Sequence, residues 1–152
     1  MAEETASGRE TALNALLALL EGIAWTNAPS PLVERNDVDK KEIPDGGLVS
    51  LRDGDPGEPE VYLSPPAYAY AHEAEIFVQF QAPTPATRDA FLDALLRDIG
   101  AALDADSTLG GAVEMVSPDA PETEHEKADG AQAIKAVRVP VVLEYVTASP
   151  LS

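Results

Sequence analysis

Residues 136–147, AVRVPVVLEYVT, decide the fold expected for this chain. The odd-numbered positions from 137 to 145 are all apolar, whereas the even-numbered positions include Arg138, Pro140 and Glu144. Alternation with a period of two indicates a strand that buries one face and exposes the other. Proline has no N–H to give to a neighbouring strand, so Pro140 predicts a sheet edge or a bulge.

The same alternation appears upstream, in residues 68–82, YAYAHEAEIFVQFQA. Its apolar positions share one face, and its polar positions, interrupted by Phe77, share the other. The segment is therefore predicted to be a second strand with one buried face. The apolar set is Ala74, Ile76, Val78, Phe80 and Ala82, and the polar set is Glu73, Glu75, Gln79 and Gln81.

Two segments have the spacing of amphipathic helices. In residues 7–24, Ser7 and Glu10 form a capping box, leucines recur at helical spacing, and Gly22 marks the end. In residues 84–106, Thr84 can cap the helix and Pro85 takes its first position. The expected buried positions are Leu13, Leu16, Leu17 and Leu20 in the first helix, and Phe91, Leu95, Ile99 and Leu103 in the second.

Shorter strands are expected at residues 32–35, 48–52, 60–64 and 112–116. Residues 53–57, DGDPG, predict a turn that joins the second and third of these, and the acidic residues 118–130 predict a loop. The chain is thus predicted to be one domain, residues 1–152, of the α+β class. Two amphipathic helices cover one face of a mixed or antiparallel sheet, and the other face stays polar.

The composition narrows the classes of partner. The formal charge is −17, with 27 acidic against 10 basic side chains, so nucleic acid and anionic membrane surfaces should be repelled. Cysteine is absent, which removes disulfides and zinc–thiolate sites from consideration. No apolar run has the length of a membrane span, and the acidic start does not have the order of a signal peptide.

No catalytic, cofactor or metal site is expected. His72 and His125 are far apart and in segments of different kinds, which favours locally bonded or solvated side chains over metal ligands. Asp53 and Asp55 alternate as in a calcium loop, but the prolines that follow favour a plain turn. Glu73 and Glu75 share a strand face, yet that face is open, whereas an acid catalyst needs a buried carboxyl.

The layout resembles the tail terminator (tail completion) family of long-tailed phages and phage-derived gene transfer particles. In that family an N-terminal helix precedes a strand pair, a strand leads into a second helix, and two strands follow. The similarity covers nearly the whole chain. It runs through RETALNALLALLEGIAW, HEAEIFVQF, ATRDAFLDALLRDIGAAL and AIKAVRVPVVLEYVTA.

The resemblance implies a structural virion protein without enzymatic activity or cofactor. Six copies would form a ring that caps the finished tail tube, ends its polymerisation and meets the head connector or stopper protein. DNA would pass through this ring without specific binding. The protein would be assembled in the host cytoplasm and reside at the head–tail junction, with no contact to membranes.

The resemblance leads to hypotheses about three sets of residues. Acidic side chains on the polar sheet face would line the lumen and repel phosphate. The turn would contact the tube, and the strand around the proline would meet a neighbouring subunit. These sets are Glu73, Glu75 and Glu144 for the lumen, Asp53, Gly54, Asp55, Pro56 and Gly57 for the tube, and Arg138 and Pro140 for the subunit edge.

Other interpretations stay open on the sequence alone. The chain fits a different head–tail junction protein, such as a stopper or completion protein. It also fits a stand-alone acidic module that presents its open sheet face to a protein partner. An enzyme whose site assembles from distant positions is the third alternative.

Overall fold

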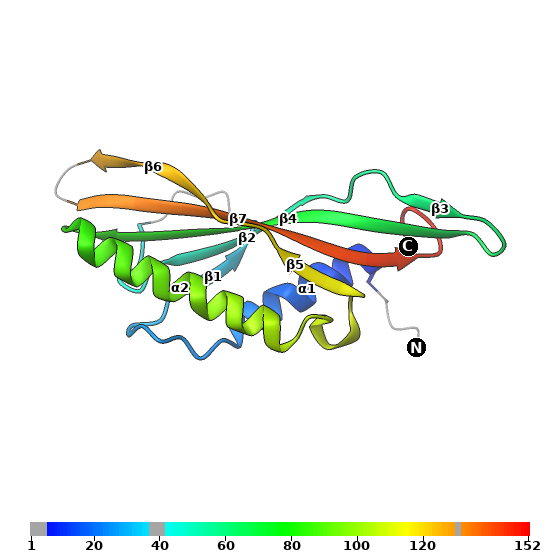
Figure 1. The fold of residues 1–152 in the computed structure, drawn as a ribbon, viewed down its shortest axis with the longest axis horizontal. Helices are drawn as coiled ribbons and strands as arrows, with labels where there is room; N and C mark the ends of the chain where they lie inside the picture. Colours follow the sequence, from blue (N-terminus) through cyan, green and yellow to red (C-terminus); the bar gives the residue numbers. More distant parts are fainter. Residues whose placement is uncertain (1–5, 37–41, 130–131) are drawn as a thin grey trace.

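The protein is described by a computed structural model that covers residues 6–36, 42–129 and 132–152. Its elements follow the chain in the order shown in Figure 1. They are α1 (Gly8–Glu21), β1 (Leu32–Arg35), β2 (Leu48–Asp55), β3 (Glu60–Tyr62), β4 (Ala67–Ala82), α2 (Pro85–Ala105), the 3₁₀ turn η1 (Leu109–Gly111), β5 (Met115–Pro118), β6 (Glu122–Asp129) and β7 (Gln132–Thr147).

The elements form two layers, with both helices on one face of a single sheet (Figure 1). The strand order is β1-β2-β4-β7-β5, with β3 also paired to β4 and β6 also paired to β7. β1 is parallel to β2, and the other pairings are antiparallel. The predicted α+β class, with a mixed sheet covered on one face by two helices, is confirmed.

The two long strands β4 and β7 form the centre of the sheet. They pair without interruption from Tyr68 opposite Thr147 to Ala82 opposite Ala133. Ile76 lies opposite Val139, so the apolar sets of both strands share the helix-facing side. The side chains of Ala74, Ile76, Val78, Val139, Val141 and Leu143 are buried there.

Both helices begin as the sequence predicts. The Ser7 side chain accepts a hydrogen bond from the Glu10 backbone N–H at 3.1 Å, and the Thr84 side chain accepts one from Thr87 at 3.3 Å. The apolar stripes of the helices face the sheet, and the Phe91 ring stacks on the Phe80 ring with centroids 5.0 Å apart. Buried positions include Leu13, Leu16 and Leu20 in α1, and Leu92, Leu95, Ile99 and Leu103 in α2.

The expected hairpin between β2 and β3 is wrong. Both strands pair with β4 instead, β2 along residues 73–79 and β3 along residues 67–69. β2 also continues beyond the expected strand end at residue 52 into the expected turn, to Asp55, with a bulge at Gly54, whose φ is +62°. The long strand β4 thus provides hydrogen-bond partners for both β2 and β3, and this pairing replaces the β2–β3 hairpin predicted from the turn residues.

The expected acidic loop of residues 118–130 is also corrected. Residues 122–129 form β6, which pairs with the first part of β7, and the strand expected at residues 112–116 is β5 at Met115–Pro118. A charged sequence is compatible with an edge strand, because charged side chains on an edge discourage pairing with other chains. The short strand expected at residues 32–35 is confirmed as β1.

Pro140 lies within a strand that is paired on both sides. β4 flanks β7 on one side. On the other side, β5 ends opposite Val141 and β6 begins opposite Arg138, so neither of these strands has a residue opposite Pro140. The Pro140 carbonyl accepts a hydrogen bond from Asp119 N–H at 2.8 Å, so its missing donor also faces this gap. The expected sheet edge is therefore corrected: the proline is tolerated where the chain passes from β5 to β6.

The bulge in β2 gives a test of this packing. A Cβ at Gly54 would lie 2.0 Å from the Glu73 carbonyl oxygen, whereas one at Gly57, where φ is +72°, would meet nothing within 4 Å. We expect Gly54→Ala to lower the free energy of unfolding by at least about 1 kcal/mol more than Gly57→Ala, because only the first adds a clash to the positive φ. Urea denaturation measures both losses, and equal losses would contradict the close approach.

Candidate functional site

The sheet face that points away from the helices carries the three acids predicted to line a lumen. Glu73 and Glu75 lie on β4 and Glu144 on β7, all on this open face. Glu73 and Glu144 are exposed and lie close together, because Val142 is opposite Glu73 and Ala71 is opposite Glu144. Both carboxylates can therefore attract or repel a charged molecule that approaches the open face.

Glu75 has a different environment, which the sequence did not reveal. Its Oε1 lies 3.2 Å from Arg52 Nη1 and 3.3 Å from Arg138 Nε. Arg52 in turn lies over the Phe77 ring, with its guanidinium carbon 4.2 Å from the ring centroid. The hydrogen bond to Glu124 and the nearby Glu75 carboxylate raise the pKa of Arg138. Glu75 therefore belongs to an ion-pair row in which Arg138 is shared with Glu122 and Glu124.

These charged side chains surround a shallow hollow of about 560 Å³ on the open face. The lining combines carboxylates with guanidinium groups, which suits contact with a protein surface of mixed charge. Within the described ranges, no group of three or more His, Cys, Asp or Glu side chains is placed to hold a metal ion. The lining includes Arg52, Asp55, Glu73, Glu75, Glu122, Arg138 and Pro140.

Arg35 is the centre of an ion-pair cluster on the opposite, helix-facing side. Its Nη1 lies 2.6 Å from Glu10 Oε1, and its Nε lies 2.8 Å from Asp53 Oδ1. A further hydrogen bond of 2.9 Å reaches the Asn14 side chain. Arg35 thus ties α1 to β1 and β2, and its hydrogen bonds lower the pKa of Glu10 and of Asp53.

This cluster corrects the turn that was predicted to contact the tube. Asp53 belongs to β2 and faces inward, where Arg35 holds it. Gly54 forms the bulge, and Asp55 ends the strand on the open face. Only Pro56 and Gly57 lie in the connection to β3, so the predicted tube-contact set does not form one surface turn.

His72 is buried next to this cluster. Its Nε2 lies 2.6 Å from the Asp53 carbonyl oxygen, and its Nδ1 lies 2.8 Å from the Tyr145 hydroxyl. A carbonyl oxygen only accepts, so Nε2 carries the proton and Nδ1 accepts from Tyr145. Burial raises the pKa of Tyr145 to about 12, which keeps its hydroxyl protonated as a donor.

The expectation that His72 is solvated or locally bonded is corrected, because its side chain is fully buried and bonded to distant segments of the chain. The alternation of β4 contained the signal, because His72 has the same parity as Ala74 and Ile76, which face the core. The partners lie 19 and 73 residues along the chain, so local reading cannot find them. His125 lies in β6, and its side chain is outside the described part of the structure.

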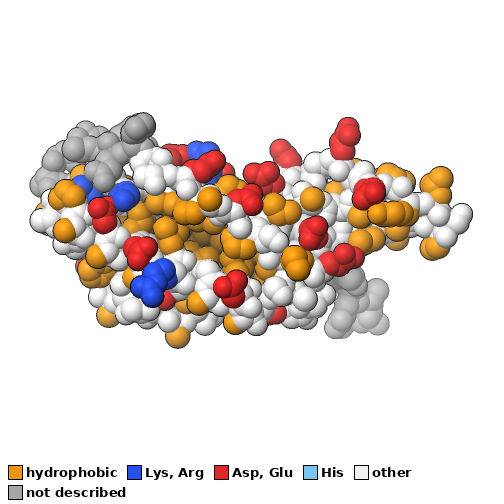
Figure 2. Space-filling view, viewed as in Figure 1, with side chains coloured by type: hydrophobic (Ala, Val, Ile, Leu, Met, Phe, Trp, Pro, Cys, Tyr) orange, Lys and Arg blue, Asp and Glu red, His pale blue; other side chains and the backbone are white. Residues whose placement is uncertain are grey.

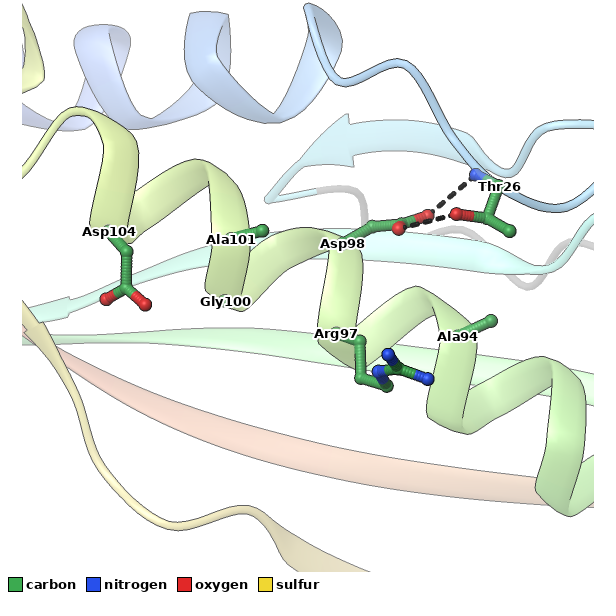
Figure 3. Close-up of a pocket in the computed structure, with 7 residues that line it drawn as sticks. All are labelled: Thr26, Ala94, Arg97, Asp98, Gly100, Ala101 and Asp104. Carbon is green, nitrogen blue, oxygen red and sulfur yellow. Dashed lines mark hydrogen bonds between the residues drawn. The ribbon is translucent and has the colours of Figure 1, made fainter.

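A second hollow, of about 570 Å³, lies along the outer side of α2 (Figure 3). The Asp98 carboxylate accepts hydrogen bonds from the Thr26 backbone N–H and hydroxyl, both at 2.8 Å. Arg97 and Asp104 project from α2 away from this pair (Figure 3). The Asp98 contacts anchor the segment after α1 to α2, which is a structural role. The rest of the lining is Ala94, Gly100 and Ala101.

Comparisons with known proteins assign no family to this chain. No protein-family model and no curated protein matches the sequence. In the described ranges, no helix combines the length and the apolar character needed to cross a membrane.

Acid titration tests the Arg35 cluster. The pKa of Glu10 and of Asp53 lies below the ordinary values of 4.5 and 3.8, so the stability they contribute is present above those values. It is lost as the pH falls through the lowered pKa values. We expect Arg35→Gln to lower the free energy of unfolding at pH 7 by about 1–2 kcal/mol, since both carboxylates are partly exposed.

The variant should also lose part of the acid dependence below about pH 4.5, because its carboxylates no longer have a lowered pKa. Chemical denaturation at several pH values measures both effects. Arg97→Gln, at an exposed position of α2, removes the same charge and is the matched control. Parallel curves of stability against pH for wild type and Arg35→Gln would contradict the role assigned to Arg35.

Proposed function

We propose that the protein is a structural subunit of the tail terminator kind. Copies of it form a ring that caps a finished tail tube, ends tube polymerisation and joins the tail to the head connector. The observation that carries this proposal is the arrangement of α1, β4, α2 and β7, with both helices on one sheet face and an acidic face left open. The chain order of these elements agrees with the layout on which the family resemblance rests.

The environment of His72 supports a structural rather than a catalytic role. Its side chain is fully buried, and both ring nitrogens are engaged, one by Tyr145 and one by the Asp53 backbone. The side chain lies on the helix-facing side of the sheet, so a substrate could reach it only if the packing over this face opened. On the accessible face, Glu75 is held between Arg52 and Arg138 as part of an ion-pair row.

The open face supports passage of DNA without binding. Glu73 and Glu144 are exposed there, and the whole chain has a formal charge of −17. Repeated around a ring, such side chains repel phosphate and keep the duplex from adhering to the wall. Glu75 is half-buried and tied into ion pairs with Arg52 and Arg138, whereas Glu73 and Glu144 are exposed, so we assign the lumen role to Glu73 and Glu144.

One observation favours a second candidate, a stand-alone module that binds a protein through the same face. The hollow between Arg52, Glu73 and Arg138 is open and carries both signs of charge. Such a surface suits a mixed-charge partner. A stand-alone module would bind this partner as a monomer, whereas a terminator acts as a ring.

Electron microscopy of the purified protein separates the two candidates. Samples at high concentration are imaged alone and after mixing with tail tubes that lack a terminator. Rings, or a cap at one tube end, are the expected result. A monomer that ignores tubes in both samples would overturn the proposed function and favour the binding module.

Reversing one exposed charge tests the lumen assignment. Glu73→Lys places a cation at the same position in every subunit of a ring, where it should attract phosphate and slow DNA passage. We expect normal rings and capped tails, but roughly tenfold or greater loss of DNA delivery, since steering effects on rates span about 10–1,000-fold. Asp93→Lys, on the exposed side of α2, is the control for the charge change. Equal DNA delivery by the Glu73→Lys and Asp93→Lys variants would contradict the assignment of Glu73 to the lumen.

A further inference from the structure

Exposed apolar side chains gather at one end of the molecule. Of the seven large hydrophobic residues that are exposed in the described ranges, three lie on or directly after β3, which projects beyond the helices with the start of β4 (Figure 1). Three more lie at the end of the sheet next to it: Val146 opposite Ala69, Met115 opposite Glu144, and Leu151 after β7, whereas Leu32 lies in the distant strand β1. Figure 2 shows hydrophobic side chains grouped at this end. We call it the arm end; it comprises Val61, Tyr62, Leu63, Met115, Val146 and Leu151.

Strand register makes part of the arm end a flat platform. On the open face, Tyr62 lies opposite Ala67, and Val146 lies opposite Ala69. The alanine side chains are short, so a partner can approach the sheet closely between Tyr62 and Val146. Leu63 follows β3 at the tip of the arm and is 81% exposed. A grouped apolar surface of this kind is typical of an interaction site, whereas single exposed apolar residues are ordinary.

The border of the arm end is acidic. Glu58 and Glu60 are exposed beside Tyr62, and Glu114 is exposed beside Met115. A partner that covers the apolar centre must meet these carboxylates at its rim. Charge complementarity therefore calls for an apolar recess edged by lysine or arginine side chains.

A second copy of this chain is a poor match for that requirement. Two arm ends would bring carboxylates together. The hollow beside Leu92 and Leu96 is bordered by Asp89, Asp93 and Lys135, and Lys135 is held by Asp89 at 2.6 Å. The more apolar hollow beside Leu19, Ile23 and Leu109 has Asp106 as the one charged residue of its lining. Neither hollow thus offers the arm end a basic rim.

We propose that the arm end is the docking surface for a different protein, one that presents an apolar recess with a basic rim. On the proposed function, on which this inference rests, that protein is the tail tube, met at its exposed end. Tyr62 and Leu63 enter the recess, and Glu58 and Glu60 pair with its rim. This assignment moves the tube contact from residues 53–57 to the neighbouring hairpin, because the Asp53 side chain is paired with Arg35 on the helix-facing side of the sheet.

The test uses the full chain and tail tubes that lack a terminator. In co-sedimentation, the double variant Tyr62→Ser/Leu63→Ser should bind tubes about 30-fold more weakly than wild type, as expected for central apolar anchors. Leu32→Ser removes a similarly exposed apolar side chain, 42% exposed, from the far part of the sheet and should bind as wild type does. Thermal melting of all three proteins checks that the fold is retained.

The charge requirement has its own variant. Glu58→Lys/Glu60→Lys should weaken tube binding by roughly tenfold at low salt, and added salt should reduce this difference. If both double variants bound tubes as tightly as wild type does, the arm-end assignment would be overturned, while the proposed function would stay intact. Loss of self-association in Tyr62→Ser/Leu63→Ser, with tube binding unchanged, would show a second copy as the occupant. Wild-type protein that ignores tubes would overturn both proposals.

Discussion

The pairing of β4 with β7 is the constraint on which the rest of the structure depends. Fifteen consecutive residue pairs fix the register, and a shift by one residue would turn every apolar side chain of one strand to the open face. The same ladder supplies both outer edges on which shorter strands assemble. β2 and β3 use the free edge of β4, while β5 and β6 use that of β7.

Polar contacts then fix α1 and the strands β1 and β2 relative to the central ladder. Arg35 joins α1 to β1 and β2, and His72 joins β4 to β2 and, through Tyr145, to β7. Asp53 takes part in both, since its carboxylate binds Arg35 and its carbonyl accepts from His72. A buried polar group is costly when it has no partner, so each of these contacts also excludes alternative registers near the β2 bulge.

The sequence predicted the elements whose signal is local and periodic. β4, β7 and both helices follow from alternation and capping within one segment. The pairing of β2 and β3 and the strand β6 could not be predicted in this way, because a distant strand decides them. The same applies to the site: the face of Glu73 follows from parity, whereas the arginines that flank Glu75 come from β2 and β7.

The length of the central ladder also explains where the interaction surfaces lie. β3 and the start of β4 extend beyond the two helices, so this end of the sheet has no helix layer over it (Figure 1). Val61 shows the effect: it lies opposite Tyr68 on the helix-facing side, yet it is exposed because no helix covers β3. A partner that covered this end would complete the layer that the chain leaves open. The acids around it restrict that partner to a surface of opposite charge.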